Sequence, residues 1–136
     1  MRQVPRAKRL PRDWPLSLVE LKSAPRERSV AQILAHEAPR VLTAAEGSTL
    51  VALDERGEAW TSAMFAQRLA RWRDAAVDVA FAIGSADGLD ASVKHRAAHL
   101  LQLSAFTLPH GLVRVLLAEQ LYRAWSLTTG HPYHRA

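Results

Sequence analysis

The stretch STLVALDERGEAWTSAMFAQRLARWRDAAVDVAFAIGSADGL, residues 48–89, decides the fold because strand and helix patterns alternate along it. The apolar, partly β-branched run Ser48–Leu53 predicts a buried strand, and the charged residues 54–58 predict a loop after it. Val77–Ile83 predicts a second strand, which the glycine-containing residues 84–88 bring to an end. Strands connected through a helix run parallel in one sheet, so this stretch predicts a parallel pair.

Apolar residues at helical spacing predict the helix between these strands. Phe65, Leu69 and Trp72 share one face of a helix that starts near Thr61 or Ser62, and its polar residues lie on the other faces.

A second helical pattern precedes residues 48–89. Ser29 is an expected N-cap, and apolar residues then recur at helical spacing until Gly47 stops the pattern. Pro39 lies inside this pattern and donates no amide hydrogen bond, so we expect a kink or two shorter helices. An earlier strand is predicted over residues 16–21, which alternate apolar and polar side chains.

The C-terminal third predicts a short helix over residues 91–98, a brief strand over 100–103 and a long helix that Pro109 opens. The long helix is apolar on nearly every face from Leu112 to Leu121, so we expect it to be buried on all sides. Two arrangements would bury it: a subunit interface in a homodimer, which we favour, or the centre of a monomeric core.

Together these elements predict an α/β fold in which a single domain, residues 1–136, holds a mostly parallel sheet flanked by helices. At 136 residues, folding buries about two thirds of the surface of the unfolded chain, enough for a core without disulfides. Residues 1–13 are expected to be disordered or the remnant of a first helix. Ligands of such sheets bind beyond the carboxyl ends of the strands, which here are the loops after Leu53, Ile83 and Leu103.

Composition narrows the chemistry. The chain has no cysteine, which excludes cysteine-ligated zinc, iron–sulfur clusters and thiol nucleophiles. No apolar run reaches the length of a membrane span and no signal peptide is evident, so a cytoplasmic protein is expected.

The net charge is +5, and residues 1–28 carry the whole excess of positive charge. This basic segment is typical of a nucleic-acid partner, or equally of a solvated end that touches nothing.

Two short motifs carry little weight alone. The loop IGSADGL, residues 83–89, lacks the spacing of a dinucleotide or phosphate-binding loop, and a simple tight turn explains its glycines. The closing residues 131–135, HPYHR, have no third ligand for a metal, so no metal site is predicted. Their side chains suit base stacking and phosphate contact, but taken alone the segment is better explained as a frayed, solvated terminus.

In order and spacing, four segments resemble the RlmH family of bacterial ribosomal RNA methyltransferases: LDERG at 53–57, IGSADGL at 83–89, LSAFTLPHGLVRVLLAEQLYRAW at 103–125 and HPYHRA at 131–136. That family is a small branch of the SPOUT class, and the resemblance implies a deep C-terminal trefoil knot. It also implies a homodimer that uses S-adenosylmethionine to methylate N3 of a pseudouridine in 23S rRNA on the assembled ribosome.

The resemblance assigns residues to the two halves of the reaction. The methyl-donor pocket would comprise Leu53, Gly84, Leu103, Ser104, Ala105, Phe106, Thr107 and Leu108, in the same three strand-end loops. N3 of pseudouridine carries a proton that must leave, which requires a base or groups that stabilise the anion. The candidates for proton removal or RNA positioning are His110, Arg114, Arg123, Tyr133, His134 and Arg135.

The chain departs from the family pattern at two places. Ser85 stands where the family usually has a second glycine. The usual N-terminal strand and helix are absent, so we expect either a misassigned start or another element in their place. Two rival functions stay open: a SPOUT methyltransferase with a different RNA target, and a non-catalytic ribosome-binding or RNA-binding domain.

Overall fold

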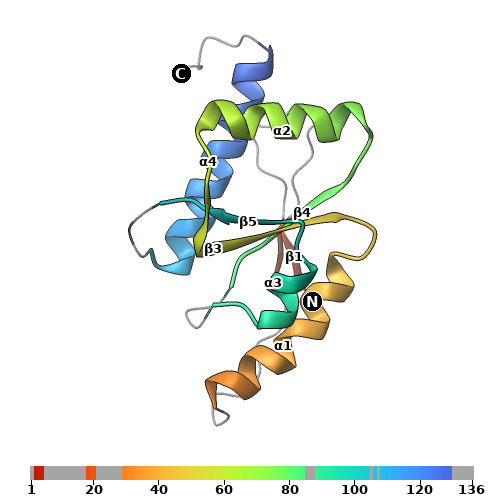
Figure 1. Cartoon of the computed structure of the whole chain (residues 1–136), viewed down its shortest axis with the longest axis vertical. Helices are drawn as coiled ribbons and strands as arrows, with labels where there is room; N and C mark the ends of the chain where they lie inside the picture. Colours follow the sequence, from red (N-terminus) through yellow and green to blue (C-terminus); the bar gives the residue numbers. More distant parts are fainter. Residues whose placement is uncertain are drawn as a thin grey trace.

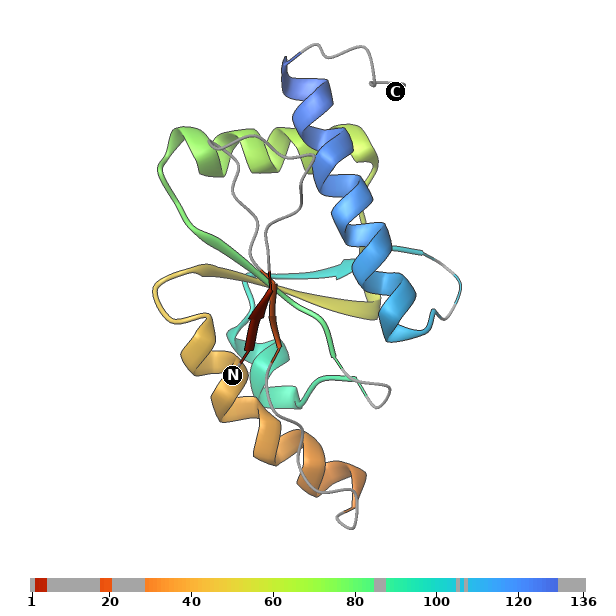
Figure 2. The ribbon, with the colours of Figure 1, turned by 180° about the vertical axis from the view of Figure 1, so that it is seen from behind.

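A computed structural model of the chain describes residues 2–4, 18–20, 29–84, 88–104, 106 and 108–129. Within these residues a sheet of three strands lies between α2 and α4 on one face and α1 and α3 on the other (Figures 1 and 2). The predicted α/β class is confirmed.

The sheet consists of β3 (Thr49–Ala59), β4 (Val79–Ala82) and β5 (His99–Gln102), in the order β4-β3-β5. Both pairings are parallel, with Ala52 opposite Ala82 and Leu53 opposite Leu101. The strands predicted over 77–83 and 100–103 are therefore confirmed, as is the parallel sheet. Because all three strands run the same way, their carboxyl ends meet at one edge.

The prediction of a loop over residues 54–58 is wrong, because β3 continues through these residues to Ala59. Leu101 of β5 lies opposite Leu53 and again opposite Glu58, so the register shifts and residues 54–57 form a bulge. Glu55, Arg56 and Glu58 are exposed. A strand segment that faces solvent tolerates charged side chains, and for this reason its composition is that of a loop.

Helix α2 (Ser62–Asp74) begins where the sequence predicts, with Thr61 Oγ1 accepting a hydrogen bond from the Met64 amide at 3.1 Å. Helix α4 (His110–Thr129) follows Pro109, also as predicted. Both helices pack on the face of the sheet that carries Val51 and Leu101. The buried members of this core are Val51, Phe65, Ala66, Leu69, Leu101, Leu117, Leu121 and Ala124.

Helix α1 (Val30–Ala44) and the short helix α3 (Ala91–Arg96) cover the other face, where Leu50 and Val93 are almost completely buried. The predicted N-cap is confirmed and is part of a capping box. The Ser29 hydroxyl accepts from the Gln32 amide at 3.3 Å, and the Gln32 side chain accepts from the Ser29 amide at 3.0 Å.

The expected division of the first helical pattern at Pro39 into two shorter helices is wrong, since α1 is one continuous helix. Pro39 and Ala35 are exposed while Ala38 is buried. The Ala35 carbonyl, which loses its intrahelical partner to the proline, can therefore be hydrated. Burial of the opposite face holds the helix together across this one missing bond.

The N-terminal region contributes β1 (Arg2–Val4) and β2 (Leu18–Glu20), which pair with each other in antiparallel fashion. The strand predicted over 16–21 is thereby confirmed at its centre. Of residues 1–13, expected to be disordered or a helix remnant, the structure describes only 2–4, and these form β1.

Within the single chain helix α4 is not buried on all sides, so its predicted place at the centre of a monomeric core is wrong, and the homodimer interface stays a prediction. Leu117 and Leu121 face the core, but Leu112 is 44% and Val115 62% exposed. Phe106, just before the helix, is 80% exposed. Phe106, Leu112 and Val115 form what we call the α4 apolar patch. In the part of the chain that is described, no helix is long and apolar enough to cross a membrane.

Candidate functional site

The bulge of β3, which stands where the first loop was predicted, and the loops after β4 and β5 lie at one edge of the sheet. Leu53, Ile83 and Leu103 are all half-buried and pack against the same core cluster beneath α2 and α4. Ile83 and Leu103 directly follow β4 and β5, and Leu53 lies in β3 at the start of its bulge, so the parallel pairing sets their spacing. The structure thus brings together Leu53, Gly84 and Leu103, the first residues of the three segments predicted to hold a methyl donor.

The glycine loop closes on itself at this edge. A Cβ atom on Gly84 would lie 2.5 Å from the carbonyl carbon and oxygen of Gly88. Gly88 has a φ angle of +88°, which side chains rarely allow. The backbone of Gly84 therefore lies directly against the backbone of Gly88, and a side chain at position 84 would force the two apart.

The third loop presents both polar and apolar groups. The Ser104 hydroxyl accepts a hydrogen bond from the Phe106 amide at 3.0 Å, which turns the chain directly after β5. Leu108 is half-buried, whereas the Phe106 ring is almost fully exposed. Ala105 and Thr107, also predicted to contact the donor, lie outside the described residues.

The residues predicted to handle the RNA are not all brought to this edge. His110 begins α4 directly after the third loop, and Arg114 follows one turn later. Arg123 lies 13 residues beyond His110 in the same helix, which places it about 20 Å farther along the axis. Tyr133, His134 and Arg135 lie outside the described residues.

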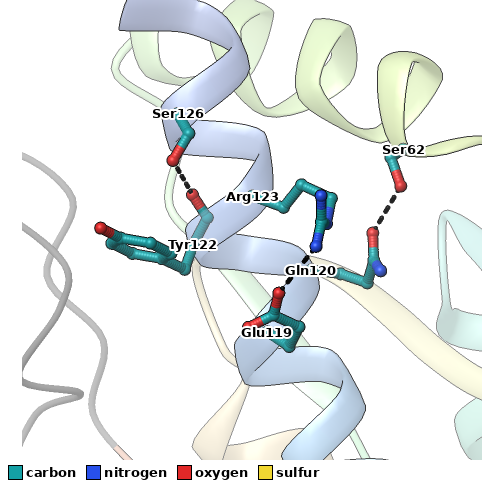
Figure 3. A network of polar contacts seen from close by, with 6 residues as sticks. All are labelled: Ser62, Glu119, Gln120, Tyr122, Arg123 and Ser126. Carbon is teal, nitrogen blue, oxygen red and sulfur yellow. Dashed lines mark hydrogen bonds and ion pairs between the residues drawn. The ribbon is translucent and has the colours of Figure 1, made fainter. Parts of the chain in front are cut away.

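Arg123 forms an ion pair with a residue of its own helix, α4, and lies one turn from a hydrogen bond that joins α4 to α2 (Figure 3). Its Nη2 atom donates to Glu119 Oε1 at 3.1 Å, and both side chains are partly exposed. One turn away, the Ser62 hydroxyl donates to Gln120 Oε1 at 2.7 Å and links α2 to α4. Buried Ser126 donates to the Tyr122 carbonyl at 3.0 Å. This part of α4 is fixed against α2, away from the strand ends.

Sequence reasoning missed a group of polar residues at the strand ends. Lys94 Nζ on α3 lies 3.2 Å from Asp54 Oδ2, and the Asp54 side chain is only 11% exposed. Gln102 Nε2 donates to the Glu55 carbonyl oxygen at 2.8 Å. These partners are some 40 residues apart in sequence, so only the sheet topology brings them together and no local motif could have indicated them.

The charge of Asp54 is stabilised in this environment. Burial raises the pKa of the Asp54 carboxyl, but the Arg56 amide hydrogen bond and the hydrogen bond and charge of Lys94 outweigh it. The pKa of Asp54 therefore lies below its ordinary value. Asp54 and Lys94 are thus a charged pair at neutral pH.

Two further observations concern the described residues outside this edge. No group of three or more potential metal ligands gathers in that part of the chain. A shallow hollow is lined by Leu42, Thr43, Glu46 and Arg96. These residues lie at the ends of α1 and α3, which lead into the starts of β3 and β5, so the hollow is at the opposite edge of the sheet.

Comparisons with known proteins agree with this geometry. A family described as predicted SPOUT methyltransferase matches residues 6–134. The ribosomal RNA large subunit methyltransferase H of Burkholderia multivorans is 53% identical over 133 residues, which cover 96% of this chain and 85% of that protein. The protein of the same name from Bordetella pertussis is likewise 53% identical over 133 residues, with 96% and 85% covered.

Proposed function

The chain belongs to the family of SPOUT methyltransferases, and on this basis we propose that it transfers a methyl group from S-adenosylmethionine to ribosomal RNA of the large subunit. Membership of the family also implies the C-terminal trefoil knot. We further propose that the acceptor is N3 of a pseudouridine in 23S rRNA on the assembled ribosome. An enzyme with this substrate acts in the cytoplasm.

The observation that carries the proposal is that the start of the β3 bulge, the end of β4 with its close glycine contact and the end of β5 meet at one edge of the sheet. Leu53 and Leu103 would pack against the donor, and the backbone at Gly84 would approach it closely. Ser104, Ala105, Thr107 and Leu108 would complete the pocket through main-chain and apolar contacts, with Phe106 available as an exposed ring. The backbone amides and carbonyls of such loops can form hydrogen bonds with the edge of a purine base such as the adenine of the donor.

The main contribution of the protein to this reaction is to position the methyl donor and the acceptor base relative to each other. When bound, S-adenosylmethionine supplies a methyl group on a positively charged sulfur. The chain's own residues then have to align the acceptor nitrogen with that methyl group, and this alignment alone accounts for much of the rate. The proton on N3 requires a base or a cation that stabilises the anion. His110 and Arg114 stand nearest to the strand ends among the described candidates, so we assign this role to their end of α4.

Arg123 needs a different explanation, because it lies far from the strand ends of its own chain. We propose that the enzyme is a homodimer and that Arg123, with Tyr133, His134 and Arg135, positions the RNA at the partner's pocket. The α4 apolar patch supports a dimer, since Phe106, Leu112 and Val115 expose apolar surface beside the donor loops.

Donor binding tests the proposal against the rival of a non-catalytic RNA-binding domain. Titration calorimetry of the folded protein with S-adenosylmethionine should show saturable binding, and no binding would contradict an enzyme. The rival RNA target is tested in a deletion strain, where mass spectrometry of 23S rRNA should find one pseudouridine that has lost its N3 methyl group. Loss of a methyl group from a different nucleotide would reject the proposed acceptor.

The dimer is tested separately by light scattering at micromolar protein. The wild type should give twice the chain mass, and Val115→Glu should shift it towards the monomer by placing a charge in the α4 apolar patch. Val77→Glu is the matched control, because Val77 is 38% exposed but lies outside the patch. A monomeric wild type, or equal effects of the two variants, would contradict the interface.

A further inference from the structure

We propose that Asp54, Lys94 and Gln102 are positioning residues that hold the β3 bulge (the first loop), the glycine loop (the second) and the loop after β5 (the third) in one arrangement and thereby set the affinity for the methyl donor. This inference rests on the proposed function, because it assumes that these loops bind the donor. It adds a role for residues that do not themselves line the predicted pocket.

The first link joins the first and second loops. Asp54 directly follows Leu53 and begins the bulge of β3. Lys94 belongs to α3, the helix that follows the glycine loop after only Leu89 and the N-cap Asp90. The ion pair of 3.2 Å, with Asp54 nearly buried, therefore ties the β3 bulge to the element that carries the glycine loop.

The second link joins the first and third loops. Gln102 is the last residue of β5 and immediately precedes Leu103. Its side-chain amide donates to the backbone carbonyl of Glu55, inside the bulge, at 2.8 Å. The bulge also lies close to the backbone of β5 at Gly57, where an added Cβ atom would lie 2.6 Å from the Leu100 carbonyl carbon.

These links matter because the sheet does not hold the bulge by itself. Ladder pairing to β5 stops at Leu53 and resumes only at Glu58. Between these points the side chains of Lys94 and Gln102 supply contacts that strand pairing would otherwise provide. One bulge thus connects all three loops, and a change in either link should move the loops relative to one another.

The test is donor affinity measured by calorimetry with S-adenosylmethionine on full-length variants. Lys94→Met should weaken binding roughly tenfold, since a small displacement of binding groups is costly, and the conservative Lys94→Arg should restore most of it. Gln102→Glu, which removes the amide donor, should weaken binding in the same direction. Arg96→Met, an exposed change on the same helix, should stay within about twofold of the wild type.

A variant that only destabilises α3 separates positioning from stability. Val93→Ala removes buried methyl groups next to Lys94 and should lower the melting temperature while largely keeping donor affinity. If Val93→Ala and Lys94→Met weaken binding equally at matched loss of melting temperature, the positioning role is overturned. Unchanged affinity in Lys94→Met, with a wild type that binds, overturns this inference alone. A wild type that does not bind overturns the proposed function as well.

Discussion

Replacing Gly84 with alanine adds one methyl group at the point where the glycine loop closes on itself. The three atoms nearest to the new Cβ are all backbone atoms of Gly88, at 2.5, 2.5 and 2.9 Å. None of them can rotate away as the tip of a side chain would. The loop must therefore open, and its opening displaces main-chain groups that we propose bind the donor.

The size of the effect follows from these distances. Carbon atoms in contact normally stay about 3.5–4.0 Å apart, so the backbone has to shift by roughly 1 Å. Overpacking of this kind costs about 1–3 kcal/mol of folding free energy. A loss of similar size in donor binding, about 1–3 kcal/mol, corresponds to a rise in Kd of about 5-fold to 150-fold.

The assay is titration calorimetry with S-adenosylmethionine, combined with thermal unfolding of the same samples. Gly111→Ala is the matched control, because it adds the same methyl group in the first turn of α4, where no atom lies within 4 Å of the new Cβ. The control should bind the donor normally and be slightly stabilised by the higher helix propensity of alanine. Gly84→Ala with the donor affinity of Gly111→Ala would refute the placement of the glycine loop in the pocket.

Three further predictions concern stability, each measured by urea unfolding. Leu50→Ala should cost about 2–5 kcal/mol, because Leu50 is 2% exposed between β3 and the α1/α3 layer; a loss below about 1 kcal/mol would contradict that packing. Ser29→Ala should cost about 1 kcal/mol through loss of the capping box, while Ser29→Asp should retain most of the stability; equal losses in both variants would argue against the cap. The loss of folding free energy in Lys94→Met should be largest at neutral pH. The pKa of Asp54 is lower in the folded state than in the unfolded state, so charged Asp54 stabilises the fold above its ordinary pKa of 3.8. This contribution is lost as the pH falls through the lowered, folded-state pKa. The difference in unfolding free energy between wild type and Lys94→Met should therefore disappear at acid pH, and a difference that is independent of pH would contradict the ion pair.

Helix starts and the order of elements were accessible from the sequence because their signals are local. Ser29, Thr61 and Pro109 each mark the start of a helix where the structure has it. The spacing of Phe65 and Leu69 likewise identifies the buried face of α2. The two loops after Ile83 and Leu103 also followed from the pattern, since parallel strands end on the same side, whereas the loop predicted after Leu53 is a bulge within β3.

The features that escaped prediction depend on contacts between distant residues. The bulge of β3 is charged and mostly exposed, so its composition is that of a loop, but its contacts to Leu100 and Gln102 and the pairing that resumes at Glu58 keep it beside β5. The pairing of Asp54 with Lys94 needs both the sheet and α3 in place. Pro39 was expected to kink or divide its helix; α1 is not divided, and the missing hydrogen bond falls on its exposed side.

The distribution of charge also takes on a different meaning. The excess of positive charge lies within residues 1–28, of which the structure describes only 2–4 and 18–20. In the described helices, Arg123 is paired with Glu119 and Lys94 with Asp54. Part of the basic complement therefore fixes the fold, and net charge alone does not identify the residues that would contact RNA.

The most direct test of the central claim is methyl transfer in vitro. Purified protein and labelled S-adenosylmethionine are incubated with ribosomes from a strain that lacks the gene, and the 23S rRNA is digested and analysed by mass spectrometry. The account predicts one new methyl group on N3 of a pseudouridine, formed at a wild-type rate by Gly111→Ala and several-fold more slowly by Gly84→Ala at a donor concentration below the Kd of that variant. Donor binding by the wild type without any methyl group appearing in the RNA would contradict it.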